Sequence, residues 1–268
     1  MSETKRKGSR TIKDIPPNIL SQLNNGQIET ANLVEWLAID QQLLLENLLK
    51  QLQRTAYMSP VLTAVGELKK TTITTVSDAI GAGLFTQATR HNDLELLKIM
   101  ANHPSDTVRC WATHSVGKND KLTLFEMLQQ IQPFAADTHF GVREIAWMAV
   151  RPKMAKNLTE TIEILARWTT NTDENVRRFA SESTRPRGVW CAHIEILKQN
   201  PALALPILEP LKADKSKYVQ DSVGNWLNDA SKTQPDFVYQ ICAKWEKEST
   251  CKETTYIINK ALRTLEKR

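Results

Sequence analysis

The stretch that decides the fold is Val142-Arg143-Glu144-Ile145-Ala146, because its pattern returns along the chain. A small apolar residue stands four positions after the Val, and in three copies an Arg follows the Val directly. The other copies begin at Val108, Val176, Val219 and Ile257, so successive copies are 34, 34, 43 and 38 residues apart. Apolar residues at i and i+4 lie on one face of an α-helix. Each copy therefore predicts a helix with one buried stripe.

A second amphipathic stretch precedes each of these helices. The preceding stretches cover residues 94–101, 122–131, 158–168, 194–211 and 237–245, and two prolines interrupt the fourth. Polar residues stand where the second helices should begin, and we expect them to act as N-caps. These residues are Ser105, Thr138, Asp173 and Ser216. Two helices in a repeat of this length are typical of HEAT-like hairpins.

Composition agrees with a helical fold. Of 268 residues, 41% are hydrophobic and 24% are charged, and only 9 Gly and 11 Pro are available for tight turns. We therefore predict an all-α protein, a right-handed α-solenoid of HEAT-like helical hairpin repeats. We expect a single solenoid over residues 14–268, with an N-terminal helical cap at about 14–90 and repeats at about 91–268. Within the cap, apolar residues at helical spacing predict a helix over residues 31–53.

The remaining composition limits the classes of function. Residues 1–13 carry five Lys or Arg and no apolar core segment, which predicts a basic disordered arm rather than a signal peptide. Four cysteines without a regular spacing indicate reduced thiols in a cytoplasmic protein. No histidine has the spacing of a metal site, so we expect neither a metal nor another cofactor, and no membrane contact.

Arginines gather in two neighbouring repeats, at Arg143, Arg177, Arg185 and Arg187, in a chain of net charge +5. A planar guanidinium donates two parallel hydrogen bonds to a phosphate, so we expect these four side chains to bind the phosphates of a nucleic acid. Tryptophans lie beside them, and aromatic faces suit sugars and bases. We therefore assign Trp147, Trp190 and Trp226 to the same surface, although each alone is more often a core residue.

Three strings of the sequence resemble one known family. They are residues 139–152, 175–190 and 222–232, and they look like the AlkC branch of the bacterial HEAT-like DNA alkylation-repair glycosylases. The resemblance implies a monofunctional DNA-3-methyladenine-type N-glycosylase. Its substrate would be double-stranded DNA containing alkylated bases, chiefly 3-methyladenine and possibly 3-methylcytosine, bound by a monomer. His139, which opens the first string, joins the expected DNA contacts.

The same resemblance assigns roles to four polar residues. Glu144 and Asp229 are expected to contact the sugar and the attacking water, while Arg178 and Glu182 form a pair that holds the site and touches phosphate. The chemistry fits, because a base alkylated at a ring nitrogen is already cationic and leaves without an acid. A fixed carboxylate can then stabilise the positive charge that grows on the deoxyribose. Arg178 and Glu182 also have the i,i+4 spacing of an ordinary surface ion pair.

Two other functions stay open at this point. A non-catalytic HEAT-like module that binds damaged or branched DNA would keep the repeats without needing the carboxylates. A protein-binding scaffold would instead present an apolar groove, against which the arginine-rich string argues.

Overall fold

The computed structural model describes residues 6–266, which form α-helices and short 3-10 turns without any β-strand in that range. The prediction of an all-α fold is confirmed. The described residues group into two compact units. One contains the chain up to Lys121 together with Asp137–Ala149, and the other contains Leu122–Ala136 and the chain from Val150 onward.

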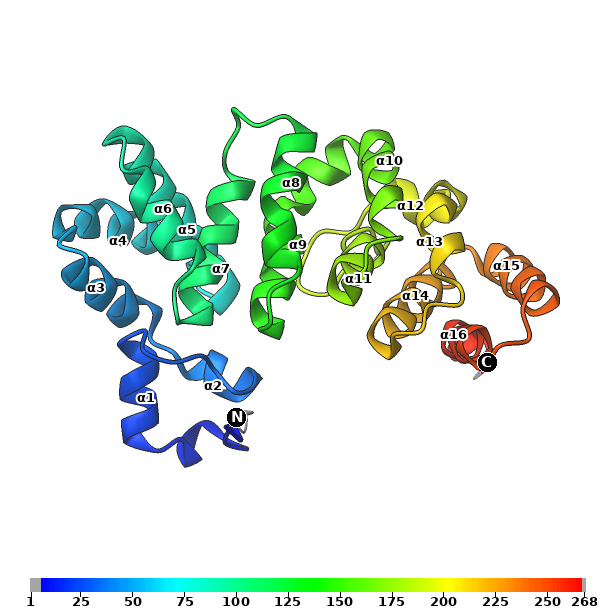
Figure 1. Ribbon diagram of the computed structural model, residues 1–268, viewed down its shortest axis with the longest axis horizontal. Coiled ribbons are helices and arrows are strands. Elements are labelled where there is room, and N and C mark those ends of the chain that lie inside the picture. Colours follow the sequence, from blue (N-terminus) through cyan, green and yellow to red (C-terminus); the bar gives the residue numbers. More distant parts are fainter. Residues whose placement is uncertain (1–5, 267–268) are drawn as a thin grey trace. The chain divides into compact units, whose positions relative to one another are not determined.

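The first unit is built around α5, which packs against α4 and α7 (Figure 1). Its helices are α1 (Pro17–Asn24), α2 (Leu33–Ala38), α3 (Gln41–Gln51), α4 (Met58–Gly66), α5 (Ile73–Arg90), α6 (Leu94–Ala101), α7 (Asp106–Gly117) and the first part of α9 (Phe140–Lys156). Two 3-10 turns, η1 (Ile12–Asp14) and η2 (Thr55–Tyr57), complete it.

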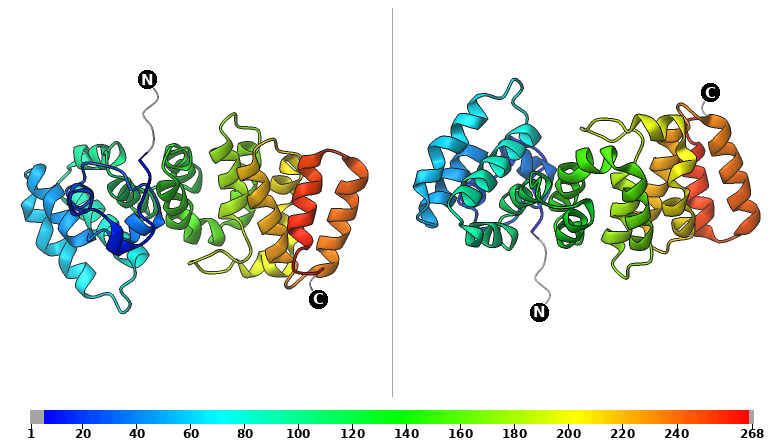
Figure 2. Two further views of the ribbon diagram at one scale, coloured as in Figure 1. Left: turned by 90° about the horizontal axis from the view of Figure 1, so that it is seen from below. Right: turned by 90° about the horizontal axis from the view of Figure 1, so that it is seen from above.

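The second unit is built around α14, which packs against α11 and α16. Its helices are α8 (Leu124–Ala135), the end of α9, α10 (Leu158–Trp168), α11 (Glu174–Ser183), α12 (Glu195–Gln199), α13 (Leu205–Leu211), α14 (Lys217–Ala230), α15 (Pro235–Glu248) and α16 (Lys252–Leu262), with a 3-10 turn, η3, at Pro201–Ala204. Figure 2 shows α14, α16 and α15 side by side in yellow, red and orange.

The predicted apolar stripe is confirmed. The first residue of each copy and the residue four positions later are buried in all five repeats. They begin the second helices of the hairpins, and helices that touch along such a stripe exclude water from it. Because this stripe is buried, only the other faces of α7, α9, α11, α14 and α16 are available for a binding site.

Overpacking at Ala180 tests this core. Ala180 has no exposed surface on α11, so Ala180→Leu should destabilise the protein by about 1–3 kcal/mol. The exposed Ala243 on α15 gives the matched control, and Ala243→Leu should change stability by less than about 0.5 kcal/mol. Urea unfolding measures both. We also expect a single transition, and two well-separated transitions would contradict one cooperative solenoid.

The predicted disordered arm is wrong for its described part. Residues 1–5 lie outside the described residues, but Arg6 makes two hydrogen bonds of 2.6 Å to the buried carboxylate of Glu35. Asn32 then donates to the backbone oxygen of Ser9 at 2.8 Å. A buried carboxylate needs a charged partner, and Arg6 supplies it. The chain from Arg6 onward is therefore fixed against α2.

The predicted helix over residues 31–53 is divided in two. The break falls between Ala38 and Gln41, where the side chain of Asp40 accepts hydrogen bonds from the backbone N–H groups of Gln42 and Leu43. An aspartate that caps a new helix ends the old one. Periodicity alone does not reveal this break, since the apolar spacing continues across it.

Among the predicted N-caps Ser105, Asp173 and Ser216, only the side chain of Asp173 accepts a capping hydrogen bond, from the N–H of Asn175. Ser105 and Ser216 hold the N-cap position without a side-chain hydrogen bond. In both turns a side chain two residues earlier accepts a hydrogen bond from the N–H of the serine. Asp214 accepts from Ser216 at 2.8 Å, and Nδ1 of His103 accepts from Ser105 at 3.1 Å. The turns between helices are therefore stabilised by side chains that the capping rule does not point to.

Candidate active site

The arginine that follows the repeated Val has a structural role. Arg109, Arg143 and Arg177 each donate through Nη1 to two backbone oxygens of the turn five and six residues earlier. Gln220 makes one equivalent bond to the oxygen of Asp214. We call this contact the turn clasp. It gives hydrogen-bond partners to carbonyl groups of the turn between two helices, which lie outside the hydrogen-bonding pattern of either helix.

The turn clasp corrects one predicted DNA contact. Arg177 also donates from Nε and Nη2 to the two oxygens of Asp214, at 2.6 and 3.0 Å. All three nitrogens of this guanidinium are thus engaged within the protein. The prediction that Arg177 binds phosphate is wrong, because the carboxylate of the next turn already occupies its fork. Arg143 uses Nη1 in the same clasp, so its expected role in DNA binding is weakened.

The second unit brings three predicted site residues into one buried ionic group. Arg185 lies just after α11 and donates from Nη1 to Glu182 at 2.7 Å. Its Nε and Nη2 both reach Oδ2 of Asp229 on α14, at 2.9 and 2.6 Å. Glu182 and Asp229 are 5% and 4% exposed. Arg185 therefore links two carboxylates from neighbouring repeats.

Three further side chains complete this group. Arg178 approaches Glu182 at 3.6 Å while its guanidinium lies 4.1 Å from the ring centre of Tyr218. Ser222 donates to the other oxygen of Glu182 at 2.8 Å, and Lys232 donates to Oδ1 of Asp229 at 3.0 Å. We call Arg178, Glu182, Arg185, Ser222, Asp229 and Lys232 the acid–arginine cluster.

The cluster keeps Glu182 ionised. Burial would raise the pKa of Glu182, but the charges of Arg178 and Arg185, with hydrogen bonds from Arg185 and Ser222, lower it. Burial likewise opposes the charge of Arg185, and the two carboxylates outweigh it and raise its pKa. The cluster therefore holds fixed charges in a site of low solvent exposure, where electrostatic effects are strong.

Sequence reasoning missed Ser222 and Lys232. Lys232 stands three positions after Asp229, a spacing at which helical side chains meet, so the i,i+3 rule could have found it. Ser222 lies inside the third quoted string, but a serine on a helix carries no signal of its own. Its partner is 40 residues away in sequence, and only the packing of α11 on α14 joins them.

The predicted tryptophan surface is largely wrong. Trp226 is completely buried and donates through Nε1 to the backbone oxygen of Thr184 at 3.0 Å. Trp147 is buried as well, and its Nε1 donates to Glu144 in the first unit at 3.0 Å. A Trp with its N–H paired inside the core adds packing rather than an open ring. Trp190, in contrast, is 64% exposed and remains a candidate for contact with DNA.

His139 is also a core residue and not a DNA contact. Its Nε2 lies 2.8 Å from the backbone oxygen of Thr30, and its Nδ1 accepts from the N–H of Gly141 at 3.1 Å. Thr30 in turn donates to the fully buried Asp106. The ring joins the N-terminal cap to α9 within the first unit.

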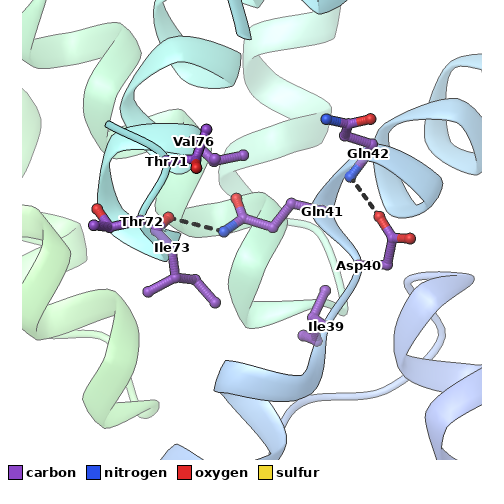
Figure 3. Close-up of a pocket in the computed structure, with 8 residues that line it drawn as sticks. All are labelled: Ile39, Asp40, Gln41, Gln42, Thr71, Thr72, Ile73 and Val76. Atoms are coloured by element: carbon purple, nitrogen blue, oxygen red, sulfur yellow. Dashed lines mark hydrogen bonds between the residues drawn. The ribbon is translucent and has the colours of Figure 1, made fainter. Parts of the chain in front are cut away.

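Several other features of the described residues do not form the site. The hollow at the starts of α3 and α5 is lined by Ile39–Gln42, Thr71–Ile73 and Val76, and its only acid, Asp40, caps α3 (Figure 3). Within residues 6–266, no three His, Cys, Asp or Glu side chains gather as a metal site would require. In that same range, no helix has both the length and the apolar character needed to cross a membrane.

Fold and cluster together define a helical-repeat protein with buried carboxylates held by arginine. The chain belongs to the DNA alkylation repair enzyme family, whose pattern it matches over residues 111–263, more than half of its length. A Bacillus subtilis (strain 168) protein, described as "Uncharacterized protein YhaZ", is 39% identical over 140 residues. That match covers 52% of this chain and 38% of the relative.

Solved structures share the fold. Pseudomonas fluorescens alkylpurine DNA glycosylase AlkC, bound to DNA containing an abasic site analog, is 21% identical with a TM-score of 0.66, over 97% of this chain and 66% of that one. AlkD2 from Streptococcus mutans is 23% identical with a TM-score of 0.59, over 77% of this chain and 98% of that one. This chain thus spans less than two thirds of both the AlkC structure and the Bacillus relative. The predicted helical-repeat fold is confirmed by these neighbours.

Proposed function

We propose that this protein is a DNA glycosylase that hydrolyses the N-glycosidic bond of cationic N-alkylated bases, such as 3-methyladenine and 3-methylcytosine, in double-stranded DNA. The observation that carries the proposal is the acid–arginine cluster in a member of the DNA alkylation repair enzyme family. Two carboxylates held by one arginine are pre-organised, so no reorganisation is needed when charge develops on the sugar.

Asp229 is the better placed of the two carboxylates for this role. Arg185 fixes Oδ2 with two hydrogen bonds, whereas Oδ1 is held by Lys232, whose side chain is 43% exposed. A phosphate that attracts Lys232 would leave Oδ1 for the sugar or the water. Glu182 is held by Arg178, Arg185 and Ser222, so we assign it the orientation of Arg185. Glu144 remains a second proposed catalytic carboxylate, in the first unit.

The lesion class is tested with a panel of duplexes. Cationic bases leave without protonation, so 3-methyladenine and 3-methylcytosine should be released, and uracil, which is neutral, should not. EDTA should have no effect on the rate, and borohydride should trap no covalent adduct, because direct hydrolysis forms no Schiff base. Release of uracil, or an efficient borohydride trap, would contradict this chemistry.

The alternative is a non-catalytic module that binds damaged or branched DNA. One observation favours it: three cationic side chains compensate the two carboxylates in the DNA-free protein. This alternative predicts tight binding to lesion-containing DNA with no release of any base from the panel.

Arg187 is the arginine we expect to contact phosphate. It is half-buried, and its Nε is shielded from solvent without a hydrogen-bond partner. Arg187→Ala should weaken DNA binding about threefold to tenfold on all sequences and reduce the salt slope by about one. Lys244→Ala removes the same charge from a side chain paired with Glu209 and serves as the control. Equal effects of the two variants in a fluorescence-anisotropy titration would refute a specific role for Arg187.

A further inference from the structure

The loop Pro186–His193 between α11 and α12 exposes two large apolar side chains. Val189 is 52% and Trp190 64% exposed, and of the seven tryptophans, all within the described residues, only Trp190 is exposed. The backbone of Trp190 has a φ of 60°, in the left-handed region that a bulky residue rarely adopts. Such a conformation persists only when the surrounding structure imposes it.

Arg151, at the end of α9, supplies that constraint. It is 3% exposed, and each of its three nitrogens donates to a different backbone oxygen of the chain around the loop. Nη2 reaches Arg185 at 2.6 Å, Nε reaches Ala192 at 3.3 Å, and Nη1 reaches Ser183. Ser183 and Arg185 come just before the loop and Ala192 lies near its end, so one guanidinium holds the two ends of the loop together. A backbone bond of 3.0 Å from Ile194 to Pro186 closes the same loop.

The loop is packed tightly onto this arginine. A Cβ atom added at Gly188 would lie 2.2 Å from Sγ of Cys191 and 3.2 Å from Nη2 of Arg151. Only a glycine allows that approach. Lysine could not replace Arg151, because a single ammonium on a flexible chain cannot reach three separate carbonyls in one plane. Arg151 is shielded from water, and this burial lowers the pKa of its guanidinium.

We infer that Arg151 is a positioning residue that holds the loop Pro186–His193 in the conformation in which Trp190 contacts DNA. The inference rests on the proposed function only in taking DNA as the partner. Trp190 offers an exposed stacking face, and the loop that carries it begins directly after Arg185 of the acid–arginine cluster. Arg151 itself is buried and acts through the loop.

A double-mutant cycle tests this inference. Arg151→Lys and Trp190→Ala should each slow release of 3-methyladenine about tenfold under single-turnover conditions. The double variant should be no slower than Trp190→Ala, because residues that act through one contact are not additive. The matched control is Arg109→Lys, a buried turn-clasp arginine in the first unit, whose effect should simply multiply with that of Trp190→Ala. Multiplying effects of Arg151→Lys and Trp190→Ala would overturn the inference.

Tryptophan fluorescence gives a readout that does not require catalysis. Acrylamide should quench Trp190 in the free protein, and binding to a duplex with an abasic-site analogue should reduce this quenching at least twofold. The protection should be lost in Arg151→Lys, and protection equal to that of the wild type would overturn the inference. If Arg151→Lys does not fold by circular dichroism, Gly188→Ala opens the same loop and should give the same loss. Arg151-dependent protection without base release would reject the proposed function and support the inference.

Discussion

Replacing Asp229 with asparagine is expected to slow release of 3-methyladenine by roughly 10² or more, with DNA affinity nearly unchanged. The amide keeps the size of the side chain and removes the negative charge that would stabilise the sugar cation. Since Asp229 is 4% exposed, it contributes little to binding of the DNA backbone. Single-turnover release, measured with protein in excess over DNA, separates this effect from affinity.

Glu209→Gln is the matched control for loss of a charge from the same unit. Glu209 on α13 pairs with Lys244 and accepts a hydrogen bond from Trp245 at 3.0 Å, outside the acid–arginine cluster. The Glu209→Gln variant should lose some stability and should release methylated bases at the wild-type rate. An Asp229→Asn variant as active as Glu209→Gln would show that Asp229 only holds Arg185 in place.

Glu182→Gln should have the largest effect on stability. Removing one partner from a buried ionic group leaves the others without compensation, which costs about 3 kcal/mol. The variant leaves Arg178 and Arg185 facing an amide that can accept but carries no charge. Chemical denaturation at pH 7 measures the loss of unfolding free energy. A loss below about 0.5 kcal/mol would mean that the buried charges of Arg178 and Arg185 do not need the charge of Glu182 for compensation.

The same variant should alter the pH dependence of stability. The pKa of Glu182 is lower in the folded protein than its ordinary value of 4.5, so the folded state holds this proton less tightly than the unfolded state. Its stabilising contribution is therefore present above pH 4.5 and is lost as the pH falls through the folded pKa. The unfolding free energies of wild type and Glu182→Gln should converge below pH 4.5. A constant difference between pH 7 and pH 3 would rule out this titration.

The fold could be predicted from the sequence because each repeat shows apolar residues at the spacing of an α-helix. An apolar pair equivalent to Val142 and Ala146 recurs in every copy, at positions that a packed helix must bury, and the structure buries all of these pairs. The broken helix at Asp40 could not be predicted in this way, because capping competes with periodicity and leaves no trace in the apolar pattern. The contact of Arg6 with Glu35 was hidden for a similar reason, since the two residues are 29 positions apart.

The candidate site was predicted less completely. The resemblance of the sequence to a known family points to the acids Glu182 and Asp229. The role of each arginine, in contrast, depends on which residue lies opposite it in the next repeat. Arg177 faces Asp214 and becomes structural, whereas Arg185 faces Asp229 and joins the site. Such pairs join residues 37 and 44 positions apart, so one sequence cannot distinguish a phosphate contact from an internal ion pair.

Detection of free methylated bases tests the central claim most directly. Duplex DNA treated with a methylating agent is incubated with the protein, and the soluble fraction is analysed by mass spectrometry for 3-methyladenine and 3-methylcytosine. We predict that both bases are released by the wild-type protein, that abasic sites accumulate in equal number, and that Asp229→Asn releases them at least 10² times more slowly. A wild-type protein that binds this DNA and releases no methylated base would contradict the proposed glycosylase activity.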